Sequence, residues 1–214
     1  MAKKLHSYRA SYEKGALTKS VVAENPFQQF KQWFEAAEAS ETIHEINAMT
    51  LSTVDATGAP RGRVVLLKEY SQAGFVFYTN YSSEKGTAIA VNPAVSLSFF
   101  WPALEQQIII KGTAQKVPTA QSEAYFKERP RKSQLGALVS NQSTVIESRQ
   151  ALEDAMEALE KKYEGKEVPK PEQWGGYLVT PSEFEFWQGR RSRLHDRIVY
   201  RMQEDHWVLQ RLQP

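Results

Sequence analysis

The chain has 214 residues, of which 41% are hydrophobic and 11% aromatic, so it can bury one good core and is expected to form one domain. It contains no cysteine, which excludes disulfides, thiolate metal ligands and a cysteine nucleophile, so any redox chemistry must come from a cofactor. The formal net charge of +2 is too small to indicate a nucleic-acid partner. Without a run of about 20 apolar residues or a signal peptide, we expect no membrane partner and a cytoplasmic protein.

The N-terminal part predicts an arm followed by a helix. Residues 1–24 lack a sustained period and are expected to form a flexible arm, while residues 25–214 are expected to form the single domain. Asn25 is a suitable N-cap and Pro26 suits the first helical position. The side chains that would share the apolar face of this helix are Phe27, Phe30, Phe34 and Ala37.

From Thr50 the pattern changes to short β-rich runs separated by turn residues, which favours antiparallel hairpins. Strands are predicted over 50–54, 61–70, 75–80, 95–101 and 107–117, with one small helix that starts at Ser82 or Ser83 before the fourth of them. Helices are predicted over 119–130 and 148–163, and further short strands over 176–181, 183–189, 197–202 and 206–212. This order favours a mainly β barrel with added helices (α+β) over a doubly wound parallel sheet.

The last arginine-rich segment contains a scarce residue type. If residues 191–201 are extended, Arg193, His195 and Arg197 share one side of a strand and form a cationic wall. Imidazole titrates near neutral pH, which suits catalysis. A charged edge strand facing solvent explains the arginines equally well, and a lone histidine is more often structural.

Two cations flank the predicted strand 61–70. Arg63 and Lys68 are both suited to bind phosphate. Their separation of five residues puts them on opposite faces, so one ligand could reach both only at a bulge or at the rim of the sheet. Two rim charges on a buried strand are the alternative interpretation.

A second group of phosphate-binding candidates lies in the predicted helix after residue 118. Tyr125 and Arg129 are one helical turn apart, and Pro130 can open a new helix whose first turn presents free N–H groups near Ser133. A further possible anion site, which helix capping explains equally well, consists of Ser82, Ser83 and Lys85.

Other classes of site are poorly supported. The sequence has no HExxH motif and no histidine pair at ligand spacing, so no metal is predicted. It also lacks the GxSxG elbow of many hydrolases and the GxGxxG and GxxxxGK loops that bind nucleotides.

Several segments together resemble a known family. In chain order they are RVVLLK, VFYTN, EKG, EQQ, YFKERPRKSQLGALVSNQS, WGGYLVTP, FEFWQG and RLHDR. On these motifs the chain resembles the pyridoxamine/pyridoxine 5'-phosphate oxidases over nearly its whole length. The resemblance implies an FMN-binding split β-barrel, a homodimer with FMN at the subunit interface, and a pyridoxal 5'-phosphate synthase. Such an enzyme oxidises pyridoxine or pyridoxamine 5'-phosphate with molecular oxygen and releases hydrogen peroxide, and ammonia from the amine.

The resemblance also assigns roles to single residues. The residues that would contact FMN are Arg63, Lys68, Tyr78, Thr79, Lys85, Gln107, Gln142, Ser143, Trp187 and Arg197. Those that would bind the substrate phosphate are Lys68, Tyr125, Arg129 and Ser133. The catalytic pair would be Arg193 and His195, which also bind the substrate ring, while Arg9 and Tyr12 in the arm would close over it. A cleft built by two chains would let Arg63 and Lys68 serve different ligands.

The roles of the catalytic pair follow from their chemistry. Arg193 is expected to stack its guanidinium on the pyridine ring, and His195 to orient polar groups of the substrate or move a proton. At one position the chain departs from the family, because Glu84 stands where many members have Arg before the matching lysine. We expect weaker FMN retention, unless Glu84 turns to solvent and complements the helix N-terminus.

Two other functions are compatible with such a barrel. One is a non-catalytic protein that binds FMN or pyridoxal phosphate. The intact set of predicted catalytic and phosphate-binding residues argues against it. The other is a nucleic-acid-binding barrel that uses the basic C-terminal strand, but aromatic residues are not interleaved there as a stacking platform.

Overall fold

The structure is a computed structural model that describes residues 3–8 and 10–214. The chain divides into two compact units. Unit 1 consists of Met1–Thr50, Ser96–Lys111 and Pro181–Pro214, and unit 2 of Leu51–Val95 and Gly112–Thr180. The unit boundaries fall within long strands or at their ends, so the same strands supply residues to both units.

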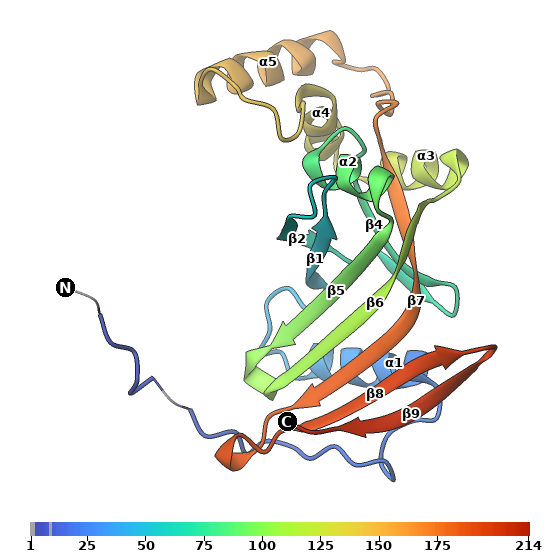
Figure 1. The fold of residues 1–214 in the computed structure, drawn as a ribbon. Helices are drawn as coiled ribbons and strands as arrows, with labels where there is room; N and C mark the ends of the chain where they lie inside the picture. Colours follow the sequence, from blue (N-terminus) through green and yellow to red (C-terminus); the bar gives the residue numbers. More distant parts are fainter. Residues whose placement is uncertain (1–2, 9) are drawn as a thin grey trace. The chain divides into compact units, whose positions relative to one another are not determined.

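Unit 1 begins with the predicted helix, α1 (Pro26–Ala39), shown in blue in Figure 1. Asn25 caps it as expected, since its Oδ1 accepts a hydrogen bond of 2.8 Å from the Phe27 N–H. The buried face of α1 packs its rings edge-on against strand residues, with Trp33 5.3 Å from Phe186 and Phe30 5.4 Å from Phe99. These contacts make the aromatic core of unit 1.

The strands that contribute to unit 1 carry this core. They are β5 (Ala94–Trp101), β6 (Gln106–Lys116), β7 (Trp174–Gln188), β8 (Asp196–Gln203) and β9 (His206–Leu212), with the start of β1 (Ala48–Val54) and the 3₁₀ turns η1 (Pro102–Leu104) and η2 (Arg191–Arg193). The second half of β7 pairs antiparallel with β8, so that Trp187 faces Arg197 across the ladder. β8 and β9 form a hairpin (Figure 1).

Unit 2 holds the remaining elements. Its strands are β1 (Ala48–Val54), β2 (Pro60–Leu66), β3 (Glu69–Ser71) and β4 (Gly74–Asn80), and its helices are α2 (Glu84–Val91), α3 (Thr119–Glu128), α4 (Arg131–Val139) and α5 (Arg149–Lys162). β4 pairs antiparallel with β3 and with the first half of β7. In Figure 1 the helices α2 to α5 gather beyond the end of β4. That end of β4 is therefore lined by helices.

Hydrogen bonds join the strands in the order β2-β1-β5-β6-β7-β4-β3, with β8 on β7 and β9 on β8. The predicted class, mainly β with added helices, is confirmed. No helix within residues 3–8 and 10–214 has the length and apolar character that crossing a bilayer requires.

Two strand predictions are wrong in detail. Residues 61–70 do not form one strand, because the chain leaves the ladder after Leu66, buries Leu67 and restarts as β3. Conversely, the two strands predicted over 176–181 and 183–189 are one strand, β7. Pro181 interrupts neither ladder, since pairing with β4 ends at Val179 and pairing with β8 begins at Glu183.

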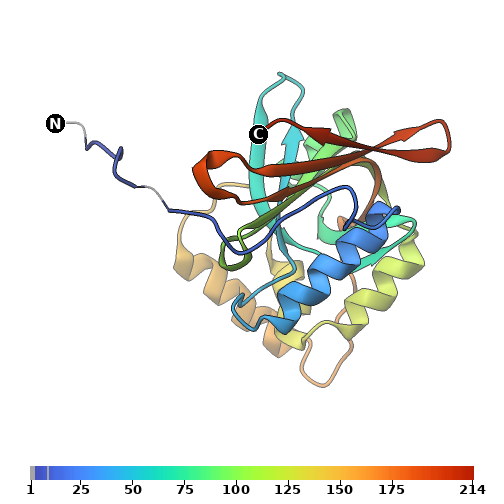
Figure 2. The same cartoon turned by 90° about the horizontal axis from the view of Figure 1, so that it is seen from below.

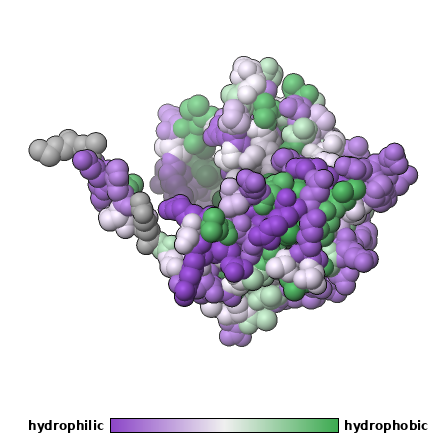
Figure 3. Space-filling view, turned by 60° about the horizontal axis from the view of Figure 1, so that its bottom comes forward, coloured by the Kyte–Doolittle hydropathy of each residue, from purple (hydrophilic) through white to green (hydrophobic). Residues whose placement is uncertain are grey.

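The segment before α1 runs beside the β8–β9 hairpin of unit 1 (Figure 2). Glu105 Oε2 accepts the N–H groups of Glu13 and Lys14 at 2.7 and 2.9 Å, and Leu17 is buried. Figure 3 shows the described residues near the N-terminus as mainly hydrophilic, in purple. Flexibility of the arm over 1–24 stays a prediction, and Arg9 lies outside the described residues.

Candidate functional site

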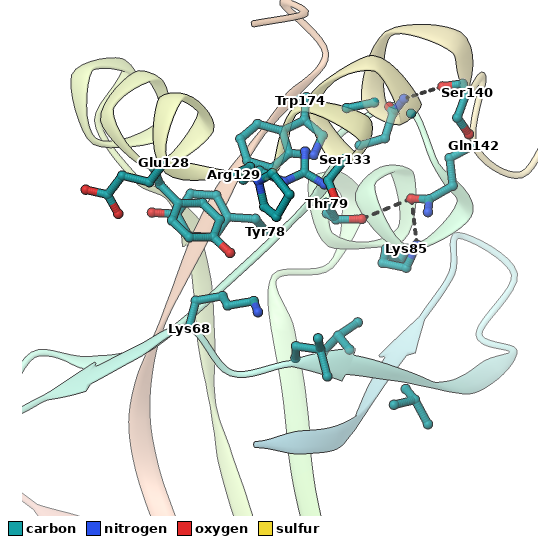
Figure 4. A pocket seen from close by; sticks show the side chains of 18 residues that line it. Lys68, Tyr78, Thr79, Lys85, Glu128, Arg129, Ser133, Ser140, Gln142 and Trp174 are labelled. Carbon is teal, nitrogen blue, oxygen red and sulfur yellow. Dashed lines mark hydrogen bonds between the residues drawn. The ribbon is translucent and has the colours of Figure 1, made fainter. Parts of the chain in front are cut away.

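A cavity of about 790 Å³ lies in unit 2 among β2, β4, the start of β7 and helices α2 to α4 (Figure 4). This volume is ordinary for a site that binds a small molecule. Of the residues predicted to contact FMN or the substrate phosphate, those that line it are Lys68, Tyr78, Thr79, Lys85, Tyr125, Arg129, Ser133 and Gln142. They come from six segments of the chain, which the fold of unit 2 brings together.

The corner between α3 and α4 positions one side of the cavity. Pro130 ends α3 and opens α4, as predicted, because the residue before a proline avoids helical geometry and Arg129 is extended (φ −66°, ψ 145°). The N–H of Ser133 itself is not one of the free N–H groups predicted near it. That N–H donates to Pro130 O at 2.8 Å, so Ser133 offers the cavity its hydroxyl instead.

The guanidinium of Arg129 is the most unusual donor in the cavity. Its Nη1 is buried and has no hydrogen-bond partner among the described residues. Its carbon Cζ lies 4.7 Å from the centre of the Trp174 ring, and burial lowers the pKa of Arg129. A buried cationic donor left unpaired is costly, so the cavity is suited to an anionic group.

Tyrosine rings form the wall beside this arginine. Tyr78 stacks on Tyr125 with ring centres 4.1 Å apart. It also stacks on Trp174 with ring centres 5.3 Å apart (Figure 4). Burial, with Glu69 and Tyr125 nearby, raises the pKa of Tyr78 to about 12. The phenol of Tyr78 is therefore neutral at physiological pH and can donate a hydrogen bond.

Lys85 marks a second cationic region of the cavity. Its Nζ donates to Ser83 Oγ at 3.3 Å. The Nζ of Lys85 and the hydroxyl of Thr79 both donate to Gln142 Oε1, at 3.0 and 3.1 Å (Figure 4). Because the amide oxygen of Gln142 accepts both bonds, its NH₂ group is the part left to bind a ligand. Burial and then the charge of Arg63 lower the pKa of Lys85, and an anion would relieve that repulsion.

The two cations of the sequence 61–70 have different surroundings. Lys68 lies after the end of β2 and lines the cavity. Arg63 does not line it, since its Nη1 donates to Thr53 Oγ1 at 2.7 Å and to Leu51 O at 3.2 Å. Because the strand ends at Leu66, Lys68 lies outside it and can line the cavity although Arg63 does not. No bulge is needed to explain their different positions.

Two further residues from the sequence analysis have partial outcomes. Ser143 is not among the lining residues and has a left-handed backbone (φ 75°). Glu84 turns to the surface and forms an ion pair with Arg61 in the first turn of α2. A carboxylate there is favourable for the helix, and the pair is half-exposed on both sides.

The other predicted residues belong to unit 1, where three rings meet. His195 lies 4.7 Å from the Trp187 ring and 5.7 Å from Tyr12, centre to centre. The backbone N–H of Arg190 donates to His195 Nδ1 at 3.1 Å. Nδ1 therefore carries no proton, and the neutral ring carries it on Nε2. Burial and the charge of Arg193 lower the pKa of His195, which favours this neutral form.

The predicted cationic wall is wrong. Ser192 and Arg193 have positive φ angles of 57° and 61°, so the chain forms the turn η2 there instead of a strand. β8 starts at Asp196, and of the three residues only Arg197 is in it. The alternation of side chains that the prediction required does not extend back to Arg193 and His195.

Asp196 connects this turn to the N-terminal segment. Its Oδ2 accepts the N–H of Leu17 at 3.0 Å and Arg190 Nη1 at 2.8 Å, and its Oδ1 accepts Arg211. Burial alone would raise the pKa of Asp196, but the bonds from Leu17 and Arg211 and the charge of Arg190 bring it below its ordinary value.

The two remaining predicted FMN contacts in unit 1 lie on strands. Arg197 on β8 donates from Nε to Glu185 at 2.7 Å and from Nη1 to Gln213 O at 3.0 Å. Gln107 on β6 is half-buried.

Sequence reasoning missed Trp174 and Asn80, which also line the cavity. The available signal was the tryptophan directly before a glycine pair at the start of a strand. In the described part of the chain no cluster of three or more His, Asp or Glu residues could hold a metal ion.

Comparisons with known proteins agree with these features. Residues 36–163 match the family model described as pyridoxamine 5'-phosphate oxidase, and residues 174–214 match one described as the pyridoxine 5'-phosphate oxidase C-terminal dimerisation region. A relative from Flavobacterium psychrophilum, named pyridoxine/pyridoxamine 5'-phosphate oxidase, is 53% identical over 99% of this chain and 100% of its own.

Two solved structures are similar as well. PhzG from Burkholderia lata 383, in complex with tetrahydrophenazine-1-carboxylic acid, gives a TM-score of 0.87 at 26% identity and covers 93% of this chain and 98% of its own. A pyridoxamine 5'-phosphate oxidase-related, FMN binding protein from Nostoc punctiforme gives 0.70 at 15% identity, covers 89% and 98%, and shares the fold.

Proposed function

The chain belongs to the pyridoxamine 5'-phosphate oxidase family, and from this premise we propose that it is an FMN-dependent oxidase acting on pyridoxine and pyridoxamine 5'-phosphates. The product is pyridoxal 5'-phosphate. Oxygen accepts the electrons and leaves as hydrogen peroxide, and the amine substrate also takes up water and releases ammonia. We include in the proposal a homodimer of split β-barrels, which the match to a dimerisation region supports. We also include a location in the cytoplasm.

One observation carries the substrate assignment. Arg129 keeps a buried, unpaired donor in a cavity that Lys68, Tyr125 and Ser133 also line. Two cations with two hydroxyl donors suit a phosphate dianion, which accepts several charge-assisted hydrogen bonds. The ring of a phosphorylated pyridine would lie outside this group of donors.

The residues around Lys85 fit the phosphate of FMN. Lys85 is buried with a lowered pKa, and Arg63 adds positive charge nearby. Gln142 contributes the polar hydrogens of its NH₂ group, because its amide oxygen is held by the bonds from Thr79 and Lys85. A phosphate would offset the mutual repulsion of the cations. Lys68, Tyr78 and Ser143 complete the set that we assign to FMN in unit 2, and for Gln107, Trp187 and Arg197 the assignment stays a prediction from the resemblance.

When bound, FMN supplies the acceptor for two electrons and passes them to oxygen. The protein residues supply position and charge. Lys68, Arg129 and Ser133 hold the substrate by its phosphate, which fixes the distance of the reacting carbon from this anchor. Tyr125 stacks on Tyr78, and this packing restricts its rotamers, so that its hydroxyl is preorganised.

His195 acts in this scheme as a donor. Since Nδ1 accepts the N–H of Arg190, the neutral ring offers its Nε2–H to an oxygen or nitrogen of the substrate. Arg193 provides a flat cation for the pyridine ring, and it lies in the turn η2 with a left-handed backbone (φ 61°). Tyr12 lies against His195 and limits its movement. The role of Arg9 stays a prediction.

The experiment is a turnover assay on the purified protein supplied with FMN. Pyridoxamine 5'-phosphate and oxygen should give pyridoxal 5'-phosphate and hydrogen peroxide in equal amounts. A protein that retains FMN and binds pyridoxal 5'-phosphate yet forms neither product would be a carrier, the alternative function, and the oxidase proposal would be wrong.

A further inference from the structure

We propose that Trp174 is a positioning residue for the phosphate of the substrate, because its indole face holds the guanidinium of Arg129 in place. The inference rests on the proposed function, in which this cavity takes a phosphorylated pyridine. Trp174 would not touch the reacting atoms. It acts through Arg129, and its loss should weaken the binding of the substrate phosphate by Arg129.

The geometry is that of a cation–π contact inside an aromatic stack. Arg129 Cζ lies 4.7 Å from the centre of the Trp174 ring, and Phe126 meets the same indole edge-on at 5.2 Å. Tyr78 stacks against Trp174 with an interplanar angle of 12°. Such an arrangement attracts the guanidinium while it leaves the N–H edge free to bind an anion.

Arg129 has few other restraints. No ion pair joins it to a carboxylate within residues 3–8 and 10–214, and its Nη1 has no hydrogen-bond partner there. A flexible side chain of this kind loses entropy when it is fixed by a ligand. The stacking contacts with Trp174 and Phe126 pre-orient Arg129, so part of that cost is met before the substrate binds.

Trp174 is itself firmly held. Trp174 is only 6% exposed, its backbone N–H donates to Pro171 O at 3.1 Å, and it pairs with Asn80 across the β4–β7 ladder. Gly176 leaves room for the ring of Tyr78 close to the strand, since a Cβ at Gly176 would lie 2.8 Å from that ring. The indole is thus a rigid platform, as a positioning role requires.

The substitutions Trp174→Phe and Trp174→Leu separate this role from simple packing. Phenylalanine keeps an aromatic face for Arg129, whereas leucine keeps an apolar volume without a π system. We expect Trp174→Leu to raise the KM for pyridoxamine 5'-phosphate about tenfold, the size of a buried cation–π contact, with kcat changed less than about twofold. Trp174→Phe should recover most of the loss. Trp207→Leu, in unit 1, is the control for losing a partly buried tryptophan.

Binding measurements give a readout that does not depend on turnover. With the FMN-loaded protein, Trp174→Leu should weaken pyridoxal 5'-phosphate about tenfold and leave the affinity for pyridoxal, which lacks the phosphate, unchanged. In combination with Arg129→Lys, the Trp174→Leu substitution should cost little more than Arg129→Lys alone. Additive losses, equal losses for both ligands, or no rescue by phenylalanine would overturn the inference. If the unsubstituted protein binds pyridoxal 5'-phosphate but oxidises nothing, only the proposed oxidase function fails.

Discussion

The Nζ of Lys85 lies 3.0 Å from Oε1 of Gln142, and both side chains line the cavity of unit 2. This bond fixes the amide so that its NH₂ group faces a ligand, and it keeps a buried cation at the N-terminal turn of α2. In the proposed FMN site, this bond would let one short helix prepare the phosphate-binding groups before any ligand arrives.

We predict that Lys85→Met weakens FMN binding by about 10- to 100-fold, since a charge-assisted bond contributes roughly 1.5–3 kcal/mol. FMN dissociation, followed by flavin fluorescence, measures the loss. Gln142→Glu should keep the bond to Lys85 but add a negative charge, and it should weaken FMN as well. Unchanged FMN affinity in both variants would remove Lys85 from the cofactor site.

The pH dependence of FMN binding follows from the same lysine. In the proposed site FMN is bound by protonated Lys85, whose pKa is lowered from the ordinary value of 10.5 by burial and by Arg63. As pH rises through that lowered pKa, the charge is lost and FMN affinity should fall, at a pH below that at which an exposed lysine titrates. Lys85→Met should abolish this alkaline decline, and FMN titrations in a pH series test it.

Glu84→Arg is expected to tighten FMN binding about tenfold, because it replaces a negative by a positive charge beside Lys85. The change also removes the ion pair with Arg61 and a carboxylate at the helix N-terminus, which should lower the free energy of unfolding by up to about 1 kcal/mol. Glu157→Arg on α5 makes the same change in net charge on another helix and should leave flavin dissociation unaltered.

For His195 we predict different results for two near-isosteric substitutions. Asparagine offers an oxygen where Nδ1 accepts the N–H of Arg190, and glutamine offers an N–H near the position of Nε2. If the Nε2–H binds the substrate, His195→Asn should lower kcat/KM at least about tenfold and His195→Gln less. The acid limb of kcat/KM should lie below 6.5, the ordinary pKa of histidine, because burial and Arg193 lower it. An acid limb above 6.5 would contradict the assignment.

Much of the cavity was predictable from the sequence. Tyr125 follows from its place in a predicted helix and Pro130 from its backbone preference, because both depend on neighbours along the chain. Arg129 lies one residue beyond α3 in an extended conformation, so helical spacing alone does not place it. Trp174 could not be found in this way, since its partners Phe126 and Arg129 are more than forty residues away in the sequence and meet it only through tertiary packing. The turn at Ser192 and Arg193 was missed for another reason. Two successive non-glycine residues with positive φ run against local preference, so the alternation of charges wrongly indicated a strand.

Asp196→Asn should destabilise unit 1, because the carboxylate is buried and accepts bonds from Leu17, Arg190 and Arg211. We expect a loss of about 2 kcal/mol in the free energy of unfolding, the scale for hydrogen bonds to a charged group, because both arginines are partly exposed. The pKa of Asp196 is lowered, so this stability is present above the ordinary value of 3.8 and is lost as pH falls through the lowered pKa. Denaturant unfolding at two pH values tests the sign, and equal losses near pH 7 and at strongly acid pH would contradict it.

The central claim is that the protein takes a hydride equivalent from a phosphorylated pyridine onto FMN. Its most direct test is a single turnover without oxygen, in which FMN-loaded protein is mixed with excess pyridoxamine 5'-phosphate and the flavin absorbance is followed. We predict that the yellow colour bleaches, that one pyridoxal 5'-phosphate forms per flavin, and that admitted oxygen restores the colour with release of hydrogen peroxide. A flavin that stays oxidised while the substrate is shown to be bound would contradict the account.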